Sequence, residues 1–315
     1  MLSSNEEIMT TSDESSLSFD HRNQQELFST KPNVITSKNN QINALKNLQI
    51  SYNQLECRYL KSVYELECKF HEQCSYLFEL RSNIINGKYE PTDDECRLKT
   101  DFIETNDRSL TADNRTGIPS FWLQTLKQVK FKELKSKPLK ISLQIPMIAE
   151  IIEPWDEPIL RCLQDIKLRL QIQPVYGFTL EFHFNDQSKV YFHNEILTKF
   201  YELQIEPDDD IFFYEGIAII RSIGCQIDWI NNVTLNDQTN EIQSSFFHFF
   251  TTSTITDQWK LATDFQIGHY IREYLLPKAI LYYTGEIFDN DDEYEFSDDD
   301  EENSSEEEEI GEGEH

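Results

Sequence analysis

The chain has 315 residues, with 57 Asp or Glu against 28 Lys or Arg, so its formal net charge at pH 7 is −29. Between Glu286 and Glu314 there are 17 Asp or Glu and no Lys or Arg. Such a chain repels nucleic acid, which argues against direct DNA binding and favours a basic protein as the partner.

The apolar fraction of 38% is low for a globular chain, and the two ends account for the deficit. Residues 1–39 are rich in Ser, Thr, Asn and Gln, and residues 286–315 are rich in acids, so we expect both to be disordered. The start of the chain lacks the features of a secretory signal, and no stretch approaches the length of a membrane span. Six cysteines without C-x-x-C spacing indicate free thiols in a reducing compartment, with no zinc site or cofactor.

Residues 40–87 predict one long helix. No Gly or Pro occurs between Pro32 and Gly87, and Gly is a typical helix stop. Apolar side chains recur within it every three or four residues. One domain cannot cover such a rod, so we expect a second copy of the chain to pack on this stripe. Two shorter helices with a kink are the alternative. The predicted dimerisation residues are Leu45, Leu48, Tyr52, Leu55, Tyr59, Val63, Leu66, Phe70 and Leu77.

Residues 88–285 predict an α+β domain. Helices are expected from Pro119 onward, over residues 156–170 and over residues 264–284, where Pro277 should introduce a kink. The segment FTLEFHF at 178–184 alternates like a strand with one buried face. Further strands are expected at residues 189–192, 211–214, 225–230 and 245–250. Successive strands flanked by helices indicate an antiparallel sheet packed on helices.

The sequence contains no motif that builds a catalytic site. His183 lies on the polar face of a predicted strand without a nucleophile or carboxylate partner placed by the pattern. Cys225 is interpreted as a small buried residue, and the aromatic run at 246–250 as core packing. We therefore predict that the protein is not an enzyme.

Acidic residues occur on a predicted helix, a strand and a loop, and then in the tail. Each run alone is explained by a hydrated surface, whereas together they are consistent with an extended anionic surface. The candidate contact acids are Asp156, Glu157, Asp165, Glu181, Glu206, Asp208, Asp209, Asp210, Asp298, Asp299, Asp300, Glu301 and Glu302. Candidate phosphorylation sites for an acid-directed kinase are Ser297, Ser304 and Ser305, where phosphate would add negative charge.

Several sequence blocks occur in a fixed order from about Leu66 to the C-terminus. They are EPTDDE at 90–95, GIPSFWLQTLK at 117–127, DEPILRCLQDIK at 156–167, FTLEFHF at 178–184, ILTKFY at 196–201, GCQIDW with NVT at 224–234, FFHFF at 246–250 and DFQIGHYIREYLLPKAILYYTGE at 264–286. Together they resemble the nucleosome assembly protein family of histone chaperones, and most closely its nucleosome assembly protein 1-like branch.

The resemblance implies a homodimer held by antiparallel long helices, and a four-stranded antiparallel sheet with helices below it. It also implies an acidic concave surface that binds core histones and shields them until DNA takes them, without catalysis. The candidate acids above would then contact histones. A coiled-coil scaffold or carrier for other basic proteins is the alternative function.

The chain departs from the family pattern in three places. The long helix is about three turns shorter, which would keep its apolar stripe in phase. Residues 131–146 look like an insertion, read either as a solvated loop or as a docking strip for the acidic tail. The basic hairpin that commonly follows NVT is missing. In the family that hairpin commonly carries a nuclear import signal. We expect the protein in both nucleus and cytoplasm, and without the hairpin the sequence does not fix the nuclear share.

Overall fold

The computed structural model describes residues 34–97, 116–129, 148–207, 210–230 and 244–287. Its contacts divide the chain into two compact units, Met1–Tyr52 and Asn53–His315. The division falls inside the long helix, and the predicted domain bounds, with residues 40–87 as the dimerisation helix, stay a prediction. Its second half belongs with the sheet.

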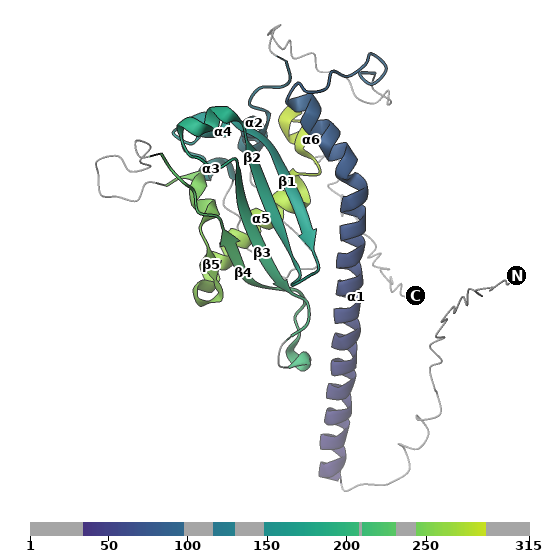
Figure 1. Cartoon of the computed structure of the whole chain (residues 1–315). Coiled ribbons are helices and arrows are strands. Elements are labelled where there is room, and N and C mark those ends of the chain that lie inside the picture. The colour runs from purple at the N-terminus through teal and green to yellow at the C-terminus, as the bar shows by residue number, and fades with distance from the viewer. Residues whose placement is uncertain (1–33, 98–115, 130–147, 208–209, 231–243, 288–315) are drawn as a thin grey trace, which may run out of the picture. The chain divides into compact units, whose positions relative to one another are not determined.

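The first described element is helix α1, Val34–Ile85, a single helix of 52 residues (Figure 1). The prediction of one long helix is confirmed, and the alternative of two shorter helices is wrong. The helix begins at Val34 rather than near Asn40, so part of the segment predicted to be disordered is helical. It ends at Ile85, and the chain turns away at Gly87, whose φ of 65° suits glycine, while Lys88 N donates to Asn83 O at 2.8 Å.

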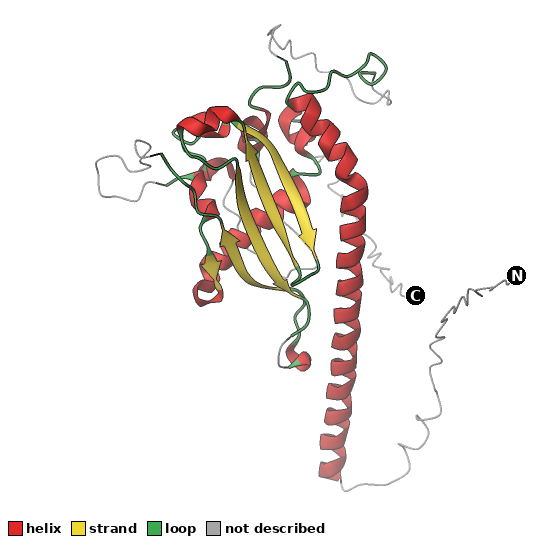
Figure 2. Cartoon of the chain, viewed as in Figure 1, coloured by secondary structure: helices red, strands yellow, loops and turns green. Residues whose placement is uncertain are grey.

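An antiparallel sheet forms the centre of the second unit (Figure 2). Its strands follow one another in space as in sequence: β1 Leu163–Gln171, β2 Gly177–Phe184, β3 Ile196–Gln204, β4 Ala218–Gly224 and β5 Ser253–Thr254. The predicted α+β class is confirmed, with a fifth strand of two residues added to the four expected. The alternation in FTLEFHF is also confirmed, because Phe178, Leu180, Phe182 and Phe184 are all buried.

The predicted helix over residues 156–170 is wrong for most of its length. Only α4, Glu157–Leu160, is helical, and β1 follows at Leu163. The apolar residues of this segment fit a helical spacing, but Ile166, Leu168 and Leu170 also alternate with Lys167 and Arg169. Pairing with β2 decides between the two patterns, since Leu168 lies opposite Leu180 and Leu170 opposite Phe178.

The four further strands predicted from apolar runs are also wrong. Three of the runs form short 3-10 turns: η3 Asp186–Val190, η4 Ile211–Phe213 and η5 Phe246–Phe250. Each turn follows a polar residue whose side chain accepts a hydrogen bond from the backbone two residues later: Asn185, Asp210 and Ser245. The fourth run contributes one isolated bridge, between Trp229 and Phe192. The strands β3 and β4 were not predicted.

Helices cover one face of the sheet. They are α2 Phe121–Lys127, α3 Ile148–Ile151, α5 Gln258–Tyr270 and α6 Ala279–Thr284; η6 Ile255–Asp257 precedes α5, and a π-helical segment, Ile271–Leu275, follows it. In Figure 2 α5 lies behind the strands. Gly268 allows this close packing, because a Cβ there would lie 2.3 Å from the Tyr201 ring. The aromatic run at 246–250 packs in the core as predicted.

A buried ion pair joins α5 to the sheet. Lys199 on β3 is 0% exposed, and its Nζ lies 2.7 Å from Asp264 Oδ2 on α5. Tyr201 and Ser222, on neighbouring strands, also donate to Asp264. Burial lowers the pKa of Lys199, and the attraction of Asp264 opposes this effect. The network fixes where α5 crosses β3 and β4, because a buried charge is tolerated only with its partners in place.

His269 on α5 predicts how stability depends on pH. Its ring stacks on Phe265, and burial, assisted by the charge of Arg272, lowers its pKa from 6.5 to about 4. The folded state therefore favours neutral His269, and stability falls as the pH drops from about 6.5 toward 4. Over this pH range His269 should lower the free energy of unfolding by up to about 3 kcal/mol, and we expect His269→Gln to remove this loss. Urea unfolding at several pH values measures the free energy of unfolding. The exposed His248→Gln serves as control, and an unchanged slope for His269→Gln would contradict the prediction.

Candidate functional site

The second half of α1 packs on the free edge of β1. Tyr64 is buried, and its hydroxyl donates to Gly177 O at 2.6 Å. His71 Nε2 lies 2.8 Å from Leu168 O, and Asn86 and Trp122 both donate to Gln164 O. Gly177 begins β2, whereas Leu168 O and Gln164 O belong to β1, and Trp122 reaches Gln164 O from α2. The helix thus covers an edge that would otherwise remain open to another strand.

Arg272, in the segment that follows α5, also strengthens the packing of α1 on the sheet. Its guanidinium lies over the rings of Tyr64 and Phe178, with centroid distances of 5.5 and 5.0 Å. It also pairs with Glu67 on α1 at 2.5 Å and with Glu273 at 2.8 Å. Arg272 belongs to the π-helical segment, and such segments often reposition a side chain. One buried cation therefore connects α1, the sheet and the helix that follows α5.

The opposite face of α1 carries the predicted dimerisation residues. The members that are exposed have 58–67% of their surface accessible: Leu45, Leu48, Tyr52, Leu55, Tyr59, Leu66, Phe70 and Leu77. Val63 is half-buried. The sequence analysis found this stripe but missed the second one, on which Cys57, Tyr64 and Ile85 are buried. The signal for the second stripe was present, since apolar residues recur on both sides of the helix after residue 53.

A groove of about 750 Å³ opens between α1 and the sheet in the second unit. Its α1 wall includes Phe70, Cys74 and Phe78, and its other wall combines β1 with Leu276 and Pro277. Two of the predicted acids, Asp165 and Glu181, also line it. Most of the groove surface is apolar, and charged groups such as Arg81 and Arg272 also line it. Such a surface is suited to covering by a protein segment.

Asp156 does not belong to the proposed contact surface. It is 0% exposed, and its carboxylate accepts three hydrogen bonds: from Ser245 Oγ at 2.6 Å, Phe246 N at 2.8 Å and Glu153 N at 3.0 Å. These bonds join the start of α4 to η5 and its buried aromatic residues. A carboxylate held in this way cannot reach a partner. We therefore assign Asp156 a structural role in place of the predicted histone contact.

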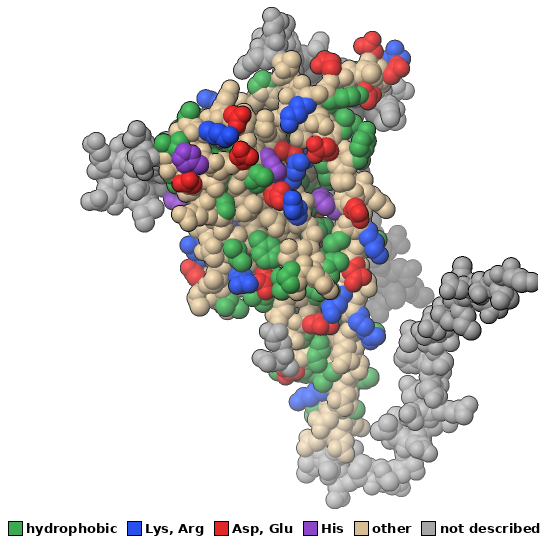
Figure 3. Space-filling model, in the orientation of Figure 1, with side chains coloured by type: hydrophobic (Ala, Val, Ile, Leu, Met, Phe, Trp, Pro, Cys, Tyr) green, Lys and Arg blue, Asp and Glu red, His purple; other side chains and the backbone are tan. Residues whose placement is uncertain are grey.

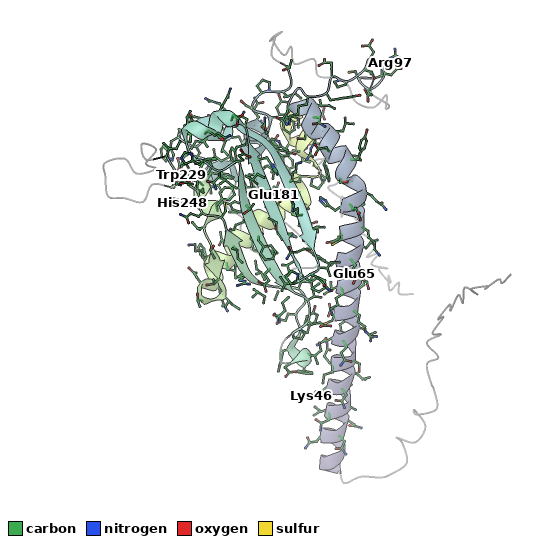
Figure 4. The ribbon with its side chains drawn as sticks, viewed as in Figure 1. Lys46, Glu65, Arg97, Glu181, Trp229 and His248 are labelled. Carbon is green, nitrogen blue, oxygen red and sulfur yellow. The ribbon has the colours of Figure 1, made fainter. Side chains whose placement is uncertain are left out.

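Two more candidate acids are paired with basic groups of the same chain. Glu157 bridges Lys127 and Arg161, and the hydrogen bond from Lys127 lowers the pKa of its carboxyl. Glu181, 9% exposed, lies 2.6 Å from Arg169 and 3.1 Å from His183. Figure 4 shows Glu181 on the sheet.

Asp165 is more buried than Glu181, at 5% exposed, and burial raises its pKa. Its ionised form is therefore disfavoured inside the fold, although Ser82 and Arg81 partly compensate. Asp165 and Glu181 lie on neighbouring strands, because Asp165 pairs with His183 across the β1–β2 ladder. Both residues are better placed to shape the groove than to attract a distant partner.

The loop between β3 and β4 carries the more exposed acids. The Glu206 side chain is 61% exposed and pairs with Lys61 of α1 at 2.5 Å. Asp210 is exposed and caps η4 by accepting from Phe212 N at 2.9 Å. Asp208 and Asp209 lie outside the described residues. So do the tail acids Asp298, Asp299, Asp300, Glu301 and Glu302 and the candidate phosphorylation sites Ser297, Ser304 and Ser305.

Those predicted acids that the structure describes do not gather into one surface. Glu157 on α4 and Glu206 in the β3–β4 loop lie at opposite ends of the sheet, as the element positions in Figure 1 show. Basic and acidic side chains also alternate over the face seen in Figure 3. The folded part therefore presents mixed charge on this face, and the 17 acids between Glu286 and Glu314 carry the concentrated negative charge.

Other kinds of site find no support in the described part of the chain. No three His, Cys, Asp or Glu residues there form a group that could hold a metal ion. Among the same residues no helix is both long and apolar enough to cross a membrane. All six cysteines are free thiols.

The structural role of Asp156 gives a direct test. We expect Asp156→Ala to destabilise the protein by about 3 kcal/mol, because it leaves buried donors without an acceptor. Its neighbour Glu157 is a matched control, since it forms ion pairs near the surface. Glu157→Ala should change stability by less than about 1 kcal/mol. Urea denaturation followed by tryptophan fluorescence compares the two. Equal stabilities for both variants would show that Asp156 is not an anchor.

Comparison with known proteins agrees with this architecture. The family model described as "Nucleosome assembly protein (NAP)" matches residues 40–137 and 139–286. Nucleosome assembly protein 1-like 1-A of Xenopus laevis is 34% identical over 296 residues, covering 81% of this chain and 71% of that protein. Human nucleosome assembly protein 1-like 1 is 36% identical over 298 residues, covering 80% and 71%.

A solved structure shows the same fold. Nucleosome assembly protein 1 from Plasmodium knowlesi is 22% identical, with a TM-score of 0.50 over 81% of this chain and 99% of that chain. Because the family model spans most of the chain and the identity to the relatives exceeds one third in the human protein, the chain belongs to the nucleosome assembly protein family, in its nucleosome assembly protein 1-like branch.

Proposed function

We propose that this protein is a histone chaperone that binds core histones, shields them from non-specific contact with DNA and assists nucleosome assembly. The observation that carries the proposal is the family match over residues 40–286. The charge distribution supports it independently, because histones are basic and the chain has a formal net charge of −29.

The charge distribution also supports a division of labour between tail and folded domain. The candidate acids of the domain are largely neutralised by neighbours such as Lys127, Arg169 and Lys61. The tail has no Lys or Arg after Lys278 to do this. We therefore assign the first electrostatic encounter to the tail, and orientation of the bound histone to the folded domain. Such an encounter weakens with salt, because charges on an exposed segment are screened.

The exposed stripe of α1 supports a homodimer. Large apolar side chains on a helix normally face protein rather than water, and here they continue from Leu45 to Leu77. Packing two copies along this stripe would bury it in the manner of a coiled coil. The dimer would present two histone-binding domains joined by one helical rod.

Modification and localisation complete the proposal. Phosphorylation at Ser297, Ser304 or Ser305 would add charge to a tail that is already acidic, and so would strengthen its attraction for histones. The expected distribution between nucleus and cytoplasm stays a prediction.

Titration of core histone dimers tests the chaperone function. We expect the full chain to bind histones at about 0.15 M ionic strength. Removing residues 288–315 should weaken binding by about tenfold, mainly through slower association. The control keeps the length of the tail and changes Asp298, Asp299, Asp300, Glu301 and Glu302 to their amides, which should have a smaller effect in the same direction. Lysozyme serves as a basic protein without histone shape. Equal affinity for lysozyme and histones would instead support a general carrier of basic proteins.

Light scattering coupled to size-exclusion chromatography tests the dimer. The chain mass is 37.3 kDa, so we expect about twice this value for the wild type. Leu66→Asp places a charge in the centre of the stripe and should shift the mass toward one chain. Val190→Asp is the control, because Val190 is similarly exposed at 64% but lies outside α1. A wild-type mass of one chain at micromolar concentration would refute the homodimer.

A further inference from the structure

One cation of the groove, Arg81, lacks a carboxylate partner. The other three Lys and Arg side chains that line the groove all form ion pairs with glutamates of the same chain. Among the residues that the structure describes, no acid forms such a pair with Arg81. Its Nη1 donates to Leu276 O at 2.6 Å, and its buried Nε has no acceptor. A guanidinium in this state is stabilised by a carboxylate that can reach it.

Asp165 supplies only part of the missing charge. Burial lowers the pKa of Arg81, and the field of Asp165 opposes this effect. Burial also raises the pKa of Asp165 itself, so the ionised form of its carboxyl is disfavoured. The surroundings of Arg81 are otherwise aromatic, because its guanidinium carbon lies 4.9 and 5.3 Å from the ring centroids of Phe78 and Trp122. This end of the groove therefore suits a segment that carries both a carboxylate and apolar side chains.

The last described residues of the chain lie close to Arg81. Tyr283 of α6 stacks on Phe121 with 4.7 Å between the ring centroids, and Phe121 meets Trp122 at 5.3 Å. Trp122 is in turn one of the two rings beside Arg81. Arg81 is also the last residue of α1 that lines the groove. The chain that continues beyond Ile287 therefore starts near the end of the groove that Arg81 marks.

The first part of the tail combines acidic and aromatic residues. Residues 288–315 contain four large apolar side chains, and three of them fall within residues 288–296. In an extended segment alternate side chains share a face, so Asp292, Tyr294 and Phe296 would share one. At about 3.3 Å per residue, the chain from Ile287 to Asp292 spans up to about 16 Å. This reach matches the three short ring contacts that separate Tyr283 from Arg81.

We propose that residues 288–296 bind in the groove of their own chain. Asp292 pairs with Arg81, and the rings of Tyr294 and Phe296 pack further along α1, toward Cys74. The groove volume of about 750 Å³ is within the range of pockets that enclose ligands of this size.

The docked segment keeps the start of the tail beside the folded domain. The 11 acids that follow Phe296 stay free to meet a basic partner. The segment also covers an apolar surface that would otherwise face water. The inference goes beyond the proposed chaperone function and does not depend on it, because it concerns contacts within one chain.

The rate at which Cys74 reacts with iodoacetamide in the full-length protein tests the docking. Cys74 lines the groove, so a bound segment shields its thiol. The double variant Tyr294→Ser, Phe296→Ser removes both rings and should raise the rate by about fivefold or more. Cys96 is exposed and lies outside the groove, so its rate should not change. Peptide mass spectrometry after brief alkylation measures the two thiols separately.

Two neighbouring acids test the pairing with Arg81. Asp292→Asn removes the proposed ion pair and should raise the Cys74 rate by about twofold. Asp291→Asn is the matched control, because it makes the same change of charge on the opposite face of an extended segment. It should leave the Cys74 rate at the wild-type value.

Each part of the proposal has its own contrary result. Equal Cys74 rates in the wild type and the double variant would show that the tail does not occupy the groove. Equal rates for Asp291→Asn and Asp292→Asn would overturn the pairing with Arg81. Protection of Cys74 that falls on dilution of the wild type would mean that the segment comes from another copy. Histone titration of the same variants is read separately, so failure of the chaperone function would leave these outcomes unchanged.

Discussion

The packing of α1 on the free edge of β1 is the contact on which the rest of the structure depends. It joins the second half of α1 to a domain with its own core. Tyr64, His71 and Arg272 make this contact with hydrogen bonds and ring contacts as well as apolar burial. Because those bonds use backbone carbonyls of the sheet, they hold this part of the helix in a defined orientation, which apolar contact alone would not do. Everything proposed about pairing requires α1 to be held in this way.

This contact gives α1 two apolar faces with different roles. One face is buried against the domain of the same chain, and the other remains exposed along the predicted dimerisation residues. A helix that is apolar on two sides needs two partners. The fold supplies one of them, and a second copy of the chain is the natural other.

Charged side chains have different roles in the folded domain and in the tail. Inside the domain, acids are paired with nearby bases, or, like Asp156 and Asp264, are buried in hydrogen-bonded networks that connect elements. Such groups fix the positions of neighbouring elements and do not supply long-range attraction for a partner. Residues 286–314 have 17 acids and no Lys or Arg, and salt screens unpaired surface charge beyond about the Debye length. Separating the two roles allows a stable domain and a strong attraction for basic proteins to coexist in one chain.

The sequence by itself determined the long helix, the exposed stripe, the strand at 178–184, the α+β class and the acidic tail. These features depend on local periodicity and composition, which a short stretch of the sequence is enough to recognise. Tertiary structure alone decided that 163–171 is a strand, because its spacing fits both periods and pairing with β2 selects one. It also decided that Asp156 is an anchor and not a contact. Burial depends on what long-range folding brings against a residue, and a carboxylate looks the same in sequence whether it faces water or the backbone of η5.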